Sequence, residues 1–184
     1  MGVLALAVAA VLSGCSSPST GTAAPTTSAT AAPTTTRTPR ITDNSGRPPV
    51  AFDPCLDLSD AQITQLGYRP ETRRKTDFPA GDYTFLSCSF NSSDFVISIS
   101  SGNVGFAEEQ AKEKRENTAF TPTVIDKRQA LTIPEDGGCS LAMQTSYGIV
   151  ILTRTSKSVA PDAPSCEGIE DTARLISQFM PAGT

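Results

Sequence analysis

Residues 16–49 cannot supply a hydrophobic core, because they consist almost entirely of Ser, Thr, Ala, Pro and Gly. Such a composition buries too little apolar surface to offset the entropy lost on ordering the chain. Prolines at positions 18, 25, 33 and 39 favour extended backbone, so the segment is expected to be a semi-stiff tether. Folding is therefore expected in residues 50–184, which is a normal size for one domain.

An uncharged apolar run at residues 3–12 precedes the tether, and Ser13, Gly14 and Cys15 follow it. The run is shorter than the roughly 20 apolar residues of a transmembrane helix and fits the apolar region of a signal peptide. No Lys or Arg precedes it, which leaves the true translation start open. An apolar run closed by small residues and a cysteine resembles a bacterial lipobox.

The lipobox resemblance implies a signal peptide at residues 1–14 and a tether at 15–49 that begins with a lipidated Cys15. Fatty acyl chains such as palmitate would then anchor the protein at the outer face of the cell membrane. We therefore expect an extracytoplasmic protein that contacts the membrane through its anchor.

Four cysteines lie in the expected domain: Cys55, Cys88, Cys139 and Cys166. An even number in an exported chain predicts two disulfides, and four cysteines allow three pairings. We favour Cys55–Cys88 and Cys139–Cys166, because each pair then links the start of a helix to a nearby strand. Zinc is the competing interpretation, but the chain has no CxxC pair and no histidine, so neither a metal nor another cofactor is expected.

The order of expected elements is helix, two strands, helix, several strands, helix. Ser59 and Gln62 form a capping box that predicts a first helix. Residues 83–90 and 95–100 alternate around a polar turn, which predicts an antiparallel hairpin. Residues 106–115 are expected to form a surface helix, with acidic residues near its N-terminal end and basic residues near its C-terminal end, which complements the helix dipole. An apolar stripe predicts a last helix that crosses the sheet: Ile169, Ala173, Ile176 and Met180.

This order predicts an α+β sandwich, an antiparallel sheet with helices packed on it and two disulfides. Arg73, Arg74 and Lys75, which stand between Tyr68 and Phe78, are expected to lie in an exposed, charged loop. Residues 149–152 are apolar on both faces and are expected to form a central strand covered on both sides.

Several short motifs together resemble a known group of proteins: Phe52-Asp53-Pro54-Cys55, Leu58-Ser59, Leu66-Gly67, Cys88, Cys139 and Pro164-Ser165-Cys166. The pattern looks like the actinobacterial secreted lipoproteins built on a domain of unknown function. The resemblance spans about residues 50–181. It implies an envelope lipoprotein with two disulfides and no established enzymatic activity or ligand.

The chain lacks the residues of the common catalytic sets. Without histidine, a Ser-His-Asp triad and a Cys-His pair are impossible. Asp53, Asp57 and Asp60 surround the start of the first helix and could form a calcium site or an acid/base pair. We favour a simpler interpretation, in which they stabilise the positive end of the helix. The domain is acidic and has no extended basic patch, which argues against nucleic-acid binding.

The basic cluster Arg73, Arg74 and Lys75 is the candidate surface contact, for an anionic headgroup, an acidic glycan or an acidic protein. We expect a non-enzymatic binding lipoprotein that presents a groove between sheet and helix, or a loop surface, to an envelope lipid, glycan or protein. One alternative is an accessory subunit of an envelope complex. A less favoured one is a glycan hydrolase that uses carboxylates.

Overall fold

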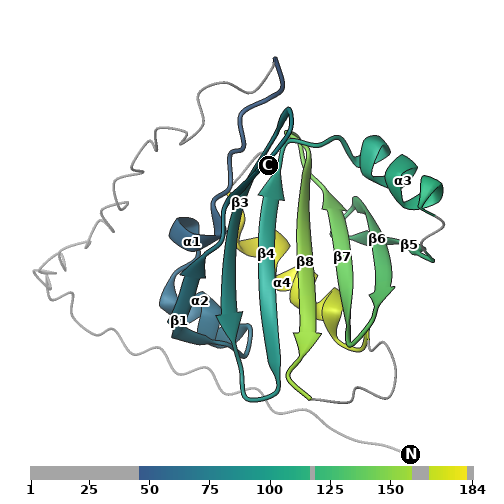
Figure 1. Cartoon of the computed structure of the whole chain (residues 1–184). Coiled ribbons are helices and arrows are strands. Elements are labelled where there is room, and N and C mark those ends of the chain that lie inside the picture. The colour runs from purple at the N-terminus through teal and green to yellow at the C-terminus, as the bar shows by residue number, and fades with distance from the viewer. Residues whose placement is uncertain (1–45, 117–118, 159–165, 182–184) are drawn as a thin grey trace, which may run out of the picture. The chain divides into compact units, whose positions relative to one another are not determined.

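A computed structural model describes residues 46–116, 119–158 and 166–181, and these form one antiparallel sheet with helices on both faces (Figure 1). In this part of the chain eight strands take the order β1-β3-β4-β8-β7-β6-β5, and β2 pairs with β3 beside β1. The strands are β1 (Arg69–Lys75), β2 (Phe78–Ala80), β3 (Tyr83–Asn91), β4 (Phe95–Gly102), β5 (Thr121–Ile125), β6 (Arg128–Glu135), β7 (Gly138–Gln144) and β8 (Ile149–Ser156).

Three helices, α1 (Pro54–Asp57), α2 (Asp60–Gln65) and α4 (Ile169–Phe179), pack on one face, which we call the back face. Helix α3 (Phe106–Arg115) packs on the opposite, front face. Figure 1 shows α4 passing behind the strands and α3 standing at one end of the sheet. The predicted α+β sandwich with two disulfides is therefore confirmed.

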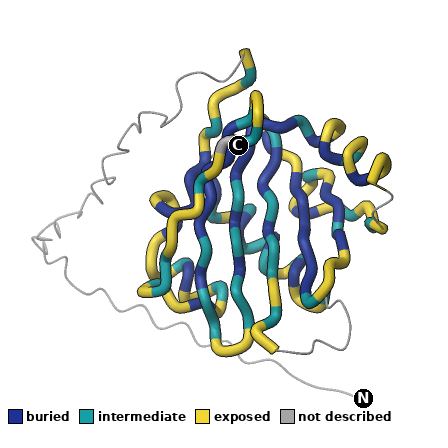
Figure 2. The backbone as a smooth tube through the Cα atoms, in the orientation of Figure 1, coloured by how far each residue is buried: buried dark blue, intermediate teal, exposed yellow. Residues whose placement is uncertain are grey.

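The back face holds the larger core, and Figure 2 shows the strands buried through the centre of the sheet. The stripe of α4 predicted from helical spacing lies in this core, with Ile169, Ala173 and Ile176 fully buried. It packs against residues that alternate along β4, β7 and β8, such as Ile99 and Leu141. Because strand side chains alternate between faces, the residues between them belong to the front face.

Both disulfides have the favoured pairing. Cys55 of α1 is bonded to Cys88 of β3, and Cys139 of β7 is bonded to Cys166, which precedes α4. Each bond ties a back-face helical segment to a strand of the sheet. The two disulfides indicate an extracytoplasmic protein. No helix among the described residues is long and apolar enough to cross a membrane.

Two elements differ from the sequence expectation. Residues 69–75, expected to lie in a loop, form the edge strand β1, whose pairing with β3 is interrupted by an irregularity between Arg69 and Arg74. Asp53 begins a short helix, α1, that the sequence did not predict; its carboxylate accepts the Cys55 N–H at 2.9 Å. The capping box of Ser59 and Gln62 is present at the start of α2, as predicted.

Strand β8 is central in the sheet, as predicted, but its cover is uneven. Ile149, Val150 and Leu152 are fully buried, whereas Ile151 on the front face is only partly buried. The back face is closed by α4, and the front face is open where α3 does not reach. This incomplete cover creates the site described next.

Candidate functional site

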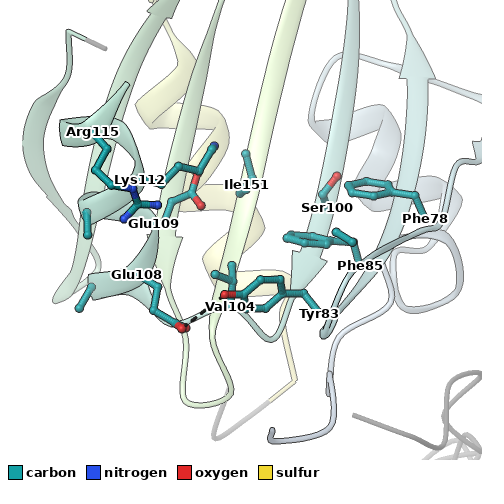
Figure 3. A pocket seen from close by; sticks show the side chains of 13 residues that line it. Phe78, Tyr83, Phe85, Ser100, Val104, Glu108, Glu109, Lys112, Arg115 and Ile151 are labelled. Atoms are coloured by element: carbon teal, nitrogen blue, oxygen red, sulfur yellow. Dashed lines mark hydrogen bonds and ion pairs between the residues drawn. The ribbon is translucent and has the colours of Figure 1, made fainter. Parts of the chain in front are cut away.

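A groove of about 780 Å³ runs between α3 and the β2–β3 edge, with the front face of the sheet as its floor. The sequence predicted a groove between sheet and helix, with the C-terminal helix as the first place to look for a cavity. The groove lies at α3 instead, and Ile169, Ala173 and Ile176 of α4 are fully buried in the back-face core. Figure 3 shows the aromatic wall on one side and the charged helix on the other. The sheet side is lined chiefly by Phe78, Tyr83, Phe85, Ser100, Val104 and Ile151.

The aromatic wall is a stacked pair of rings. Phe78 on β2 and Phe85 on β3 face each other in register, with centroids 4.9 Å apart and planes within 10° of parallel. Phe85 is 8% exposed, but Phe78 is 44% exposed. A large apolar ring left this open beside an apolar floor is a typical feature of a binding surface.

Gly102 of β4 makes room for this wall. A Cβ at position 102 would lie 2.4 Å from a ring carbon of Phe85, its neighbour across the β3–β4 ladder. The Phe85 ring therefore lies over β4 only because residue 102 has no side chain. The shape of the groove floor therefore depends on glycine at position 102.

The other wall is α3, which presents small and charged side chains to the groove: Ala107, Glu108, Glu109, Ala111, Lys112 and Arg115. Ala107 and Ala111 are one helical turn apart and leave space that larger side chains would fill. Phe106 is the buried apolar residue of α3, and it packs with Val104 and Ile149 in the smaller front core. Helix α3 therefore covers one end of the front face and leaves the rest open.

Arg47 links the two walls at the mouth of the groove. Its guanidinium donates two hydrogen bonds to the Glu108 carboxylate, at 2.8 and 2.9 Å. It also lies over the Tyr83 ring, 4.1 Å from the centroid. Hydrogen bonds from Arg47, and then from the Gly105 N–H, lower the pKa of Glu108 to about 2. Arg47, near the expected end of the tether, thus contacts the folded domain.

Two carboxylates on α3 share one lysine. Lys112 Nζ lies 3.1 Å from Glu109 and 3.0 Å from Glu113, whose side chains are 8% and 6% exposed. Burial by itself would lower the pKa of Lys112, but the two carboxylates outweigh it and raise this pKa above its usual value. Arg115 also lines the groove, and Figure 3 shows its guanidinium near Lys112. No hydrogen bond or ion pair joins Arg115 to the described part of the chain.

The basic cluster singled out in the sequence is divided by the structure. Arg73 turns inward: it donates to the carbonyls of Cys55 and Leu58 and lies 2.6 Å from Asp60. Arg73 therefore satisfies backbone carbonyl groups at the C-terminal end of α1. Arg74 and Lys75 are exposed, and only these two remain candidates for a surface contact.

Each carboxylate singled out in the sequence has a local partner in the structure. Asp53 caps α1, Asp57 accepts the Asp53 N–H at 2.6 Å, and Asp60 pairs with Arg73. No group of acidic or cysteine side chains among the described residues could hold a metal ion. Cys15, the predicted lipidation site, lies outside the described residues.

Sequence patterns identified α3 but did not place the groove beside it. The aromatic wall, the helical wall and the floor residue Ile151 of the groove come from separate elements of the chain, and Phe85 looked like an ordinary member of an alternating strand. One available signal was the front-facing residues of β4, Ser98, Ser100 and Gly102, which are too small to cover the face of a central strand. The front face is open over β4 because these small side chains do not fill the space above the strand.

A family model described as "Protein of unknown function (DUF3558)" matches residues 10–178, which include every strand of the sheet. The chain belongs to the DUF3558 family. It matches no curated protein and no solved structure. Membership of DUF3558 confirms the domain of unknown function that the cysteine motifs suggested, and it assigns no ligand.

Proposed function

We propose that this protein is a lipoprotein of the actinobacterial cell envelope whose folded domain binds an apolar envelope molecule in the front groove, without catalysis. The observation that supports the proposal is the groove. Its volume of about 780 Å³ lies within the range of roughly 300–1,000 Å³ that is usual for ligand pockets. Its lining also has the usual character, a mainly apolar surface with a few polar groups.

Binding is favoured over catalysis by the state of the groove carboxylates. Glu108 is held by Arg47, and Glu109 is held by Lys112. A carboxylate fixed in an ion pair is a poor general base, because pairing stabilises its charged form. The carboxylate-dependent hydrolase is supported still less by Asp53 and Asp57, which serve the local structure of α1.

Native mass spectrometry of the full chain, extracted from membranes of its own host, tests the ligand. We expect a bound species on the wild-type protein and on Ala61→Trp. Ala111→Trp should lose it, because the indole would occupy the groove. Ala61 and Ala111 are both exposed helical alanines, but only Ala111 lines the groove. A wild-type protein that never carries a bound species would contradict the proposal.

The anchor is tested separately. Replacing Cys15 by Ala should move the protein from the membrane fraction to the soluble extracytoplasmic fraction, because the lipid attachment site is then missing. Mass spectrometry of the mature N-terminus should show an acylated Cys15 in the wild type. An unmodified Cys15 in membrane-bound protein would exclude this anchor.

The accessory-subunit alternative keeps less support. Of its three proposed docking cations, Arg73 is engaged inside the domain, and only Arg74 and Lys75 are exposed. Two exposed cations on an edge strand need no partner to explain them, because charged residues protect sheet edges from pairing with other chains. We therefore place the site on the front face and not at this edge.

A further inference from the structure

The charges that line the groove do not all have partners. Glu108 is paired with Arg47, and Glu109 with Lys112. Arg115 lies at the last turn of α3, and it makes no hydrogen bond or ion pair within the described residues. The groove therefore presents one free guanidinium beside an apolar surface.

A guanidinium offers a planar set of donors that match a carboxylate or a phosphate. Its pairing with an anion is stronger beside apolar surface than in open water, because water screens the charges less there. The aromatic wall of Phe78 and Phe85 faces this cation from the opposite side of the groove. One ligand satisfies both features if it carries an apolar chain and an anionic head.

We propose that the front groove binds a long-chain lipid with an anionic head, and that Arg115 pairs with that head while the chain lies against Phe78, Phe85 and Ile151. The inference rests on the proposed function and names the chemistry of its ligand. Lys112 provides a second positive charge near the head, although Glu109 and Glu113 already hold it.

A favourable interaction with the C-terminal end of the helix dipole could explain a cation at Arg115 without any ligand. Lys114 separates the two explanations. It is exposed in the same turn of α3 and carries the same charge, but it does not line the groove. A dipole effect would involve both residues, whereas head recognition involves Arg115 alone.

The test measures the affinity of the full chain for a pyrene-labelled long-chain fatty acid and for its uncharged methyl ester. Arg115→Gln should weaken binding of the acid by about tenfold, the size expected when a hydrogen bond to a charged group is lost. Lys114→Gln should leave it unchanged, and neither variant should alter binding of the ester. A long-chain alkyl phosphate should compete with the acid, whereas inorganic phosphate should not, because it has no chain.

The outcomes separate this inference from the proposed function. Equal affinities for acid and ester, equal effects of Arg115→Gln and Lys114→Gln, or displacement by inorganic phosphate would overturn the assignment of the head. In each case Ala111→Trp would still abolish probe binding if the groove is the ligand site. Probe binding that survives Ala111→Trp would instead overturn the proposed function and this inference with it.

Discussion

At the scale of single residues, the groove depends most directly on the missing side chain of Gly102. Gly102→Ala would place a methyl group 2.4 Å from the Phe85 ring and push that ring away from β4. We expect weaker probe binding and a loss of stability of about 1–3 kcal/mol, which is usual for overpacking. Probe titration and urea unfolding of the variant measure the two effects.

The double variant Gly102→Ala/Phe85→Leu provides the control. The smaller side chain relieves the clash, so stability should recover while the aromatic stack with Phe78 stays lost. If Gly102→Ala alone binds the probe as the wild type does, the Phe85 ring is not a fixed wall of the groove.

The Arg47–Glu108 ion pair gives the groove mouth a predictable dependence on pH. The pKa of Glu108 in the folded chain is about 2, lowered first by Arg47 and then by the Gly105 N–H. Because this folded-state pKa lies below the unfolded value, the pair stabilises the fold above the unfolded pKa, and this contribution is lost as pH falls through the folded pKa. The pair is partly exposed, so the effect on stability will be small.

A carboxyl titration followed by NMR measures this directly. Arg47→Gln should raise the pKa of Glu108 back toward its usual value of 4.5. Arg74→Gln, which removes an arginine distant from the groove mouth, should leave it unchanged. A Glu108 pKa that does not respond to Arg47→Gln would show that the pair does not form in solution.

At the scale of elements, local patterns predicted those helices and strands whose signals lie within a few residues. The capping box gave α2, the turn at residues 91–94 gave the β3–β4 hairpin, and helical spacing gave α4. Strand β1 was missed because its sequence, Arg-Pro-Glu-Thr-Arg-Arg-Lys, has no apolar alternation. It is held by pairing with β3 and by the inward turn of Arg73, and both depend on distant residues.

The groove was less predictable than the elements that build it. Phe85 and Ile151 meet the same space only because the strand order places β4 between β3 and β8. That order joins segments that are more than 50 residues apart, and no local pattern encodes it. The role proposed for Arg115 could not be predicted for a similar reason, since a cation at the C-terminal end of a helix is favourable wherever the helix packs.

The β5–β6 hairpin contains a turn that its sequence does not suit. Asp126 and Lys127 connect the strands with φ values of 46° and 70°, a geometry that favours Asn-Gly. Asp126→Asn/Lys127→Gly should therefore stabilise the fold by about 1 kcal/mol, because the strain of a left-handed side chain is removed. Urea unfolding measures the gain.

The β6–β7 hairpin offers the matched control. Gly137 has a φ of 74° in the turn between these strands. Gly137→Lys should destabilise the fold by a similar amount, because it introduces the strain that Lys127→Gly removes. If both changes have the same sign, the backbone geometry of the two turns does not control stability.

At the scale of the whole molecule, the sheet separates two layers with different tasks. The back layer contains both disulfides, three helices and the larger core, whereas the front layer has one helix and the groove. The stability of the domain thus comes mainly from the back layer. The fold tolerates an open front face because the cross-linked back layer supports the sheet.

This separation predicts that stability and binding can be changed independently. Cys139 and Cys166 are 27 residues apart, and closing a loop of this length is worth roughly 3.5 kcal/mol in the chain-entropy model. Cys139→Ala/Cys166→Ala should lower the free energy of unfolding by about this amount. At temperatures where the variant is still folded, its affinity for the pyrene-labelled fatty acid should equal that of the wild type.

Ala111→Trp is the complementary variant, since it fills the groove from an exposed position on α3 and leaves both disulfides in place. Circular dichroism during urea unfolding and probe titration of the same samples compare the two variants. If the disulfide variant loses probe binding while its circular dichroism remains native, the front groove is held in shape by the back layer. The two faces of the sheet would then form a single coupled unit, and the separation argued from the packing would be wrong.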